Sequence, residues 1–64
     1  MGLDRAVKRL RWRRGLTQAV LAQKIGVTEA YVSMIESGVR RTPSLPILKK
    51  LAKALGVPVA NLLR

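Results

Sequence analysis

The fold is decided by residues 18–36, which read QAVLAQKIGVTEAYVSMIE. Two helices that cross closely need a small residue at the crossing, and Ala22 supplies it. The tight turn between them needs a residue that tolerates positive φ, and Gly26 is placed to provide it. Val32 and Ile35 have the spacing of apolar residues on the inner face of the second helix. This stretch therefore predicts two helices that meet at about a right angle, the helix-turn-helix pattern.

Short helical segments separated by glycines flank this stretch on both sides. Upstream, an amphipathic helix is expected over residues 3–14. Downstream, a helix is expected between Ser44 and Gly56, followed by a last short turn over residues 58–63. The expected N-caps are Thr17, Thr28 and Ser44. Because no segment alternates polar and apolar residues over a strand's length, we predict an all-α fold with four helices and a short fifth.

The composition of the 64-residue chain excludes most catalytic chemistry. It has no Cys and no His, which removes thiol catalysis, thiolate metal sites and the usual general base. Hydrophobic residues make up 48% and aromatic residues only 3%, so a core must be built from aliphatic side chains. Thirteen Lys and Arg against three Asp and Glu give a formal net charge of +10. We therefore expect no enzyme, no cofactor and no metal, and a polyanionic partner instead.

We also expect the chain to carry no targeting signal. Its longest uninterrupted apolar stretch, residues 55–60, is far shorter than the ~20 residues of a membrane-spanning helix. The basic N-terminus has no apolar region after it, unlike a signal peptide. The chain is therefore expected to be a soluble, cytoplasmic, cationic module.

Three segments together resemble the Cro/CI (Xre-type) helix-turn-helix family. They are LTQAVLAQKIGVTEAYVSMIESG at residues 16–38, TPSLPILKKLAKALGV at residues 42–57, and a final LL. The family includes phage repressors, restriction-modification controllers and many antitoxins. The resemblance implies a compact, lambda-repressor-like domain of four to five helices over residues 1–64, with the helix-turn-helix over residues 17–36. In such a domain the third helix enters the major groove while the second sits across the DNA backbone.

The resemblance also implies roles for individual residues. The side chains expected to read base edges are Glu29, Ala30, Ser33 and Met34. The residues expected to contact phosphates are Gln18, Thr28, Tyr31, Ser37, Gly38, Arg40 and Arg41, the two arginines lying in a loop that follows the backbone or probes the minor groove. Arg11 and Glu36 are expected to form a structural ion pair between the first and third helices.

Glu29 and Met34 depart from the Gln or Arg that many family members have at these positions. A carboxylate facing DNA is costly unless it accepts a hydrogen bond. Glu29 is therefore expected either to accept from cytosine N4, held in place by the Gln18 amide, or only to complement its helix dipole. Met34 offers apolar contact, for which a thymine methyl is the expected target. Trp12 is expected to lie half-buried beneath arginine stems rather than to stack on a partner.

The C-terminal residues predict a two-fold homodimer on a palindromic operator. One recognition helix contacts too few base pairs to find a site in a genome, and two such helices about 34 Å apart double the contacts. The aliphatic residues available for an interface are Val57, Val59, Ala60 and Leu63. Of these, Val59 and Leu63 are expected to point outward, with Leu62 in the core. The alternative is a monomer in which all of them cover the core.

These features predict a regulator that binds double-stranded DNA sequence-specifically, a repressor or controller that acts by occupying its operator. We expect the binding domain to use all 64 residues and to leave none for an effector domain. An antitoxin that also holds a toxin would look the same at this length. A cationic membrane-active helical protein is a second class, against which the right-angle corner at Gly26 argues. Non-specific RNA binding is a third, for which the usual aromatic stacking platform is missing.

Overall fold

The computed structural model describes residues 2–39 and 43–63. Its elements are α1 (Leu3–Arg13), α2 (Gln18–Ile25), α3 (Glu29–Glu36), α4 (Leu45–Leu55) and a 3₁₀ helix, η1 (Val59–Asn61). No strand occurs within those two ranges, so the prediction of an all-α fold with four helices and a short fifth is confirmed. α1 ends one residue earlier than expected, with Arg14 as its C-cap.

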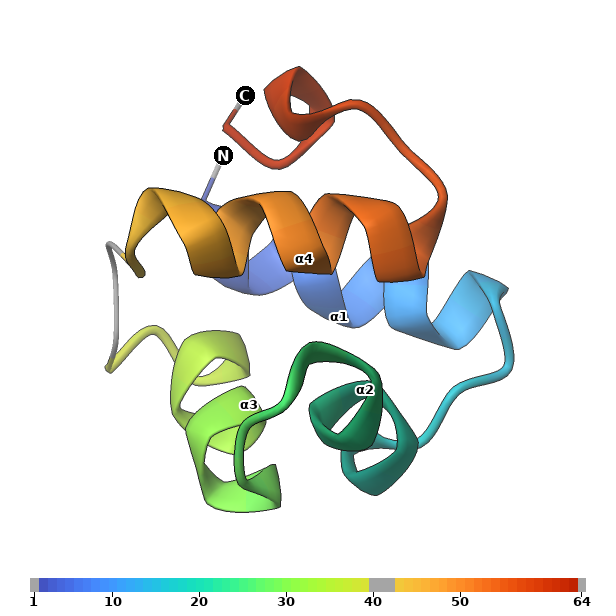
Figure 1. Ribbon diagram of the computed structural model, residues 1–64, viewed down its shortest axis with the longest axis vertical. Coiled ribbons are helices and arrows are strands. Elements are labelled where there is room, and N and C mark those ends of the chain that lie inside the picture. The colour runs from blue at the N-terminus through green and yellow to red at the C-terminus, as the bar shows by residue number, and fades with distance from the viewer. Residues whose placement is uncertain (1, 40–42, 64) are drawn as a thin grey trace.

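The helices pack in two groups around one core. Figure 1 shows α2 and α3 together on one side of α4, with α1 behind α4 and η1 on the opposite side. α3 contacts both α1 and α2, while α4 contacts α1, α2 and η1. The packed helices together span 24 × 23 × 20 Å. α4 and α1 therefore form the base on which α2 and α3 are held.

Side-chain and backbone caps set the limits of the two central helices. The Thr17 hydroxyl accepts a hydrogen bond from the Val20 N–H, and Thr28 does the same for Tyr31, both at 3.1 Å. Gly26 ends α2 in the left-handed conformation, with φ +73°. This φ is costly for residues with a Cβ, so the position favours glycine. The turn between α2 and α3 is thus specified locally, as the sequence predicts.

Ser44 precedes α4 as expected, but its side chain makes no capping hydrogen bond. An N-cap side chain accepts from the N–H of the second or third helical residue. The second residue of α4 is Pro46, which has no N–H. One of the two usual donors is therefore missing at this helix start.

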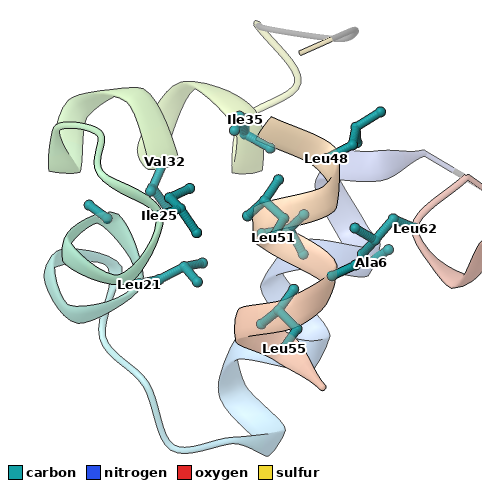
Figure 2. Close-up of a cluster of buried hydrophobic side chains, with 12 residues drawn as sticks. Ala6, Leu21, Ile25, Val32, Ile35, Leu48, Leu51, Leu55 and Leu62 are labelled. Atoms are coloured by element: carbon teal, nitrogen blue, oxygen red, sulfur yellow. The ribbon is translucent and has the colours of Figure 1, made fainter. Parts of the chain in front are cut away.

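The core is aliphatic, as the composition requires. Figure 2 shows side chains from α2 and α3 meeting those of α4, with Ala6 and Leu62 on the far side of α4. The buried apolar residues are Ala6, Val7, Leu21, Ala22, Ile25, Val32, Ile35, Leu48, Leu51, Ala52, Leu55 and Leu62. Arg11 is the buried charged residue among the described side chains. Burial of Ala22, Val32 and Ile35 confirms the inward face predicted for the helix-turn-helix.

Candidate nucleic-acid interface

The outer face of α3 is formed by the residues expected to read bases. Glu29, Ala30 and Ser33 are exposed, and Met34 is half-buried. Positions i, i+1, i+4 and i+5 lie on one side of a helix, so these four side chains share a face. The core residues of α3 lie on the opposite side. α3 is therefore anchored by its inner face and presents its outer face to solvent.

Arg11, near the end of α1, and Glu36, at the end of α3, form a two-point ion pair. Arg11 Nε donates to Glu36 Oε2 at 2.6 Å, and Nη2 donates to Oε1 at 3.0 Å. Arg11 Nη1 donates to the carbonyl oxygen of Leu16 at 2.8 Å. The two charged side chains are only 11% and 4% exposed. The hydrogen bond to Glu36 raises the pKa of Arg11, outweighing the opposite effect of burial.

Gln18, the first residue of α2, extends this network. Its Nε2 donates to Glu36 Oε1 at 3.1 Å. The expectation that the Gln18 amide would hold the carboxylate of Glu29 is therefore wrong. Arg11 fixes the Glu36 carboxylate beside the first turn of α2, whereas Glu29 is exposed and water competes for its oxygens. Gln18 is thus positioned by α1 and α3 together.

Trp12 does not lie where the sequence suggested. The expectation that arginine stems half-bury it is wrong, because its side chain is 69% exposed. Nearby Arg11 turns inward to Glu36, and Arg14 Nε donates to the Leu55 carbonyl oxygen at 3.1 Å. Trp12 instead lines an open groove of about 490 Å³. Its other lining residues are Arg11, Gly15, Leu16, Thr17, Gln18 and Glu29.

The residues expected to contact phosphates are spread around α3. Thr28 is exposed at its N-cap, and Tyr31 is half-buried and packs against the core. Ser37 is exposed, and its Oγ donates to the Met34 carbonyl oxygen at 3.1 Å. Gly38 is half-buried, and its backbone has the left-handed conformation. Arg40 and Arg41 lie outside the described residues.

The described surface as a whole is strongly cationic. Of the three carboxylates, Glu36 is paired, Asp4 is half-buried and Glu29 is exposed. The exposed cations of the described helices and their caps are Arg5, Lys8, Arg9, Arg13, Arg14, Lys24, Lys49, Lys50 and Lys53. Such an excess of positive charge attracts polyanions over a distance of about a Debye length, ~10 Å at moderate salt.

The C-terminal residues divide between core and surface. Leu62 is buried and Leu63 is 63% exposed, as expected. Val59 is half-buried against the core, so the expectation that it points outward is wrong. The 3₁₀ turn rotates successive residues by more than an α-helix does, which brings Val59 inward together with Leu62, three residues on. Ala60 is exposed, and Val57 is half-buried.

Sequence reasoning missed two residues that the structure singles out. Arg14 bonds the last carbonyl of α4 and so joins α1 to the far end of the chain. Nothing separates Arg14 from its neighbouring arginines in the sequence. Leu45, at the start of α4, is 57% exposed despite its position on the apolar stripe of that helix. Both outcomes depend on where α4 lies relative to other elements.

No group of three or more possible metal-ligating carboxylates, thiols or imidazoles occurs in the described part of the chain. Among the same residues, no helix is both long and apolar enough to cross a membrane.

The arrangement of α2, its turn and the outward face of α3 defines a helix-turn-helix domain. A helix-turn-helix family model matches residues 7–62. The chain belongs to the Cro/CI (Xre-type) helix-turn-helix family, as its motifs suggested.

The relatives of this chain include transcriptional regulators. It is 34% identical over 61 residues to the HTH-type transcriptional regulator SinR of Bacillus subtilis (strain 168), covering 95% of this chain and 55% of SinR. The crystal structure of SinR, the master regulator for biofilm formation, in complex with DNA superposes with a TM-score of 0.92. That match has 34% identity and covers 97% of this chain and 98% of that one.

A second similar structure is the restriction-modification controller protein C.AhdI from Aeromonas hydrophila. Its TM-score is 0.87 at 35% identity, covering 94% of this chain and 89% of that one. The chain spans about half the length of the curated SinR that it matches.

Proposed function

We propose that this chain binds double-stranded DNA sequence-specifically, with α3 in the major groove. The observation that carries the proposal is the fixed geometry of α2 and α3. The Glu36 carboxylate accepts hydrogen bonds from both Arg11 and Gln18, so the outer face of α3 and the first turn of α2 keep one relative position. A major groove about 12 Å wide admits such a helix, and a phosphate suits the N-terminal turn of the neighbouring one.

Within this proposal the exposed face of α3 reads bases. Glu29 accepts from cytosine N4, Met34 contacts a thymine methyl, and Ala30 and Ser33 complete the face. The backbone contacts are assigned to Gln18, Thr28, Tyr31, Ser37 and Gly38, with Arg40 and Arg41 adding charge. These contacts fix the register of α3 but carry no sequence information. The net charge of +10 supports them.

The biological role that follows is transcriptional regulation by occupancy of an operator. A repressor or controller needs no catalysis and no cofactor for this, and it acts in the cytoplasm, where the DNA is. We further propose a homodimer, because two copies of α3 on a palindrome supply the discrimination that one lacks. Exposed Leu63 and Ala60, beside half-buried Val57 and Val59, provide its interface.

Selection of bound duplexes from a random library tests this proposal. The expected result is an enriched palindrome whose half-sites lie about one helical turn apart, ~10 base pairs centre to centre. Binding that enriches no sequence above the starting library would reduce the function to non-specific DNA binding. If the full chain binds no duplex, even at low salt, the proposed DNA-binding function is overturned entirely.

A further inference from the structure

The indole of Trp12 is a large aromatic surface that the fold leaves uncovered. It is 69% exposed, although tryptophan contributes more to stability when its ring is buried. The guanidinium groups of Arg11 and Arg14, either side of it in the sequence, are bound to Glu36, Leu16 and Leu55. These two guanidinium groups are thus held by other partners.

The surroundings of Trp12 are those of a binding groove rather than of open surface. The groove extends from Trp12, across the segment between α1 and α2, to Gln18 and Glu29. Leu16 is half-buried there and adds apolar surface, and Thr17 is the N-cap of α2. The groove therefore joins Trp12 to Gln18, which is assigned to a phosphate, and to Glu29, which is assigned to a base.

We infer that Trp12 packs its ring on the deoxyribose–phosphate edge of one DNA strand, next to the phosphate that Gln18 contacts. The inference rests on the proposed function and adds a positioning contact outside the expected set. The apolar ring covers the sugar, and the indole N–H, a donor only, faces a phosphate oxygen. The contact adds affinity without favouring any base.

The net charge of +10 on the chain favours a nucleic-acid strand as the occupant of the groove. Arg9 and Arg13, on the same helix as Trp12, are exposed. The charged residues that line the groove itself are Arg11, which is paired with Glu36, and Glu29. A ligand that fits needs repeated negative charge and an apolar face between the charges. A DNA strand has both, because sugars alternate with phosphates. An acidic peptide is the competing occupant, and the experiment separates the two.

Trp12 is the only tryptophan of the chain, so selectively excited indole fluorescence reports on this position alone. The full chain is titrated with a selected operator duplex and, at low salt, with a scrambled duplex. In both complexes we expect a blue-shifted or quenched emission and a several-fold loss of quenching by acrylamide. Trp12→Ala should weaken both duplexes about five- to tenfold, as removal of a partly buried ring predicts.

Two further readouts separate this contact from a structural or electrostatic one. Trp12→Ala should keep the wild-type melting temperature, the preferred base sequence and the salt dependence, since it removes no charge. Trp12→Phe should retain most of the affinity, because it keeps an apolar ring. A melting temperature lowered as much by Trp12→Ala as by a core substitution would overturn the inference in favour of a structural role.

The remaining outcomes are also decisive. Tight duplex binding with unchanged emission and unchanged Trp12→Ala affinity would overturn the inference and leave the proposed function intact. Failure of the wild-type chain to bind any duplex would overturn both. Equal protection of the indole by poly-glutamate would identify an acidic-peptide site. An emission change with protein concentration alone would identify a contact between copies of the chain, and either result would also overturn the inference.

Discussion

Arg11 and Glu36 join the end of α1 to the end of α3 through hydrogen bonds of 2.6 and 3.0 Å, and Gln18 shares the same carboxylate at 3.1 Å. The Glu36 carboxylate therefore links three elements: α1, the first turn of α2 and the last turn of α3. Because α3 is only eight residues long, its direction depends on how both of its ends are held. The ion pair holds one end, and the Thr28 cap and the turn at Gly26 hold the other.

Removal of the Glu36 carboxylate should therefore destabilise the fold. Glu36→Ala leaves the Arg11 guanidinium largely buried without its partner, which costs about 3 kcal/mol for pairs of this kind. Glu29→Ala, the matched control, removes an exposed carboxylate and should cost less than about 0.5 kcal/mol. Thermal unfolding of both variants measures the difference. Equal melting temperatures would show that the pair contributes nothing to stability.

Replacement of Arg11 by Lys should weaken the pair and make it sensitive to pH. Lysine has its three N–H donors on one nitrogen and cannot match the separate Nε, Nη1 and Nη2 contacts that Arg11 makes with Glu36 and Leu16, so we expect a loss of about 1–2 kcal/mol. The raised pKa of Arg11 keeps the wild-type guanidinium charged, and its contribution is present throughout the range below its unfolded pKa.

A lysine paired with Glu36 would also have a raised pKa in the folded state. Its stabilising contribution is therefore fully present below the unfolded lysine pKa of ~10.4 and lost as pH rises through the folded value. Denaturant unfolding from pH 7 to pH 11 should show a steeper alkaline decline for Arg11→Lys than for the wild type. Parallel curves would contradict this account of the pair.

Gly56 should be less tolerant of alanine than Gly26, although both have left-handed φ, at +70° and +73°. A Cβ at Gly26 meets nothing within 4 Å, so Gly26→Ala should cost only the backbone strain, about 1–2 kcal/mol. A Cβ at Gly56 would collide with the Arg14 guanidinium, which must then leave the Leu55 carbonyl. We expect an extra loss of about 1 kcal/mol at Gly56.

A double-mutant cycle checks that assignment. In an Arg14→Ala background, the collision and the hydrogen bond are both absent, so the cost of Gly56→Ala should fall to that of Gly26→Ala. If the two glycine variants still differ by the full amount in that background, Arg14 is not the cause.

Substitutions on α3 and at the two arginines that follow it in the sequence, Arg40 and Arg41, should affect DNA binding in different ways. Glu29→Gln and Met34→Ala should change the preferred bases with little effect on salt dependence, since base contacts specify and phosphate contacts position. Repeated selection from random duplexes measures the preference. A sequence preference unchanged by both substitutions would mean that α3 is not the reader.

Arg40→Ala and Arg41→Ala should instead weaken all duplexes alike. If each subunit neutralises four or five phosphates, a dimer has a log–log salt slope of roughly −7 to −9, and each phosphate left without its arginine flattens the slope by about one unit. Because each substitution removes one arginine from both subunits of the dimer, the slope should change by about two units. Duplex titrations across a salt series provide the measurement.

Leu63 should govern assembly without contributing to the fold. Its side chain is 63% exposed, so Leu63→Ser should leave the melting temperature nearly unchanged and reduce the number of subunits on each operator. Leu62→Ala, the adjacent control, removes a fully buried side chain and should cost about 2–5 kcal/mol. Analytical ultracentrifugation with and without operator measures the assembly. Two Leu63→Ser subunits bound as tightly as the wild type would place the interface elsewhere.

The sequence by itself determined the helix-turn-helix and most of the helix limits. Thr17 and Thr28 bond N–H groups three residues away, and Gly26 adopts its φ within a single residue. Such interactions act over a few positions, so local pattern predicts them. The inward faces are also local in origin, because helical spacing decides which side chains lie together. The pairing of Arg11 with Glu36 was implied by family resemblance rather than by spacing, since 25 residues separate them.

Only the tertiary structure decided where the long polar and aromatic side chains lie. Gln18 bonds Glu36 instead of Glu29 because α1 and α3 bring that carboxylate to the first turn of α2. Trp12 is exposed, while Arg14 reaches Leu55, 41 residues away, and Arg11 reaches Glu36. Val59 lies against the core because a 3₁₀ turn, rather than an α-helix, packs on α4. Each outcome is a competition between partners distant in sequence, and it is decided by which partner the packed helices bring within reach.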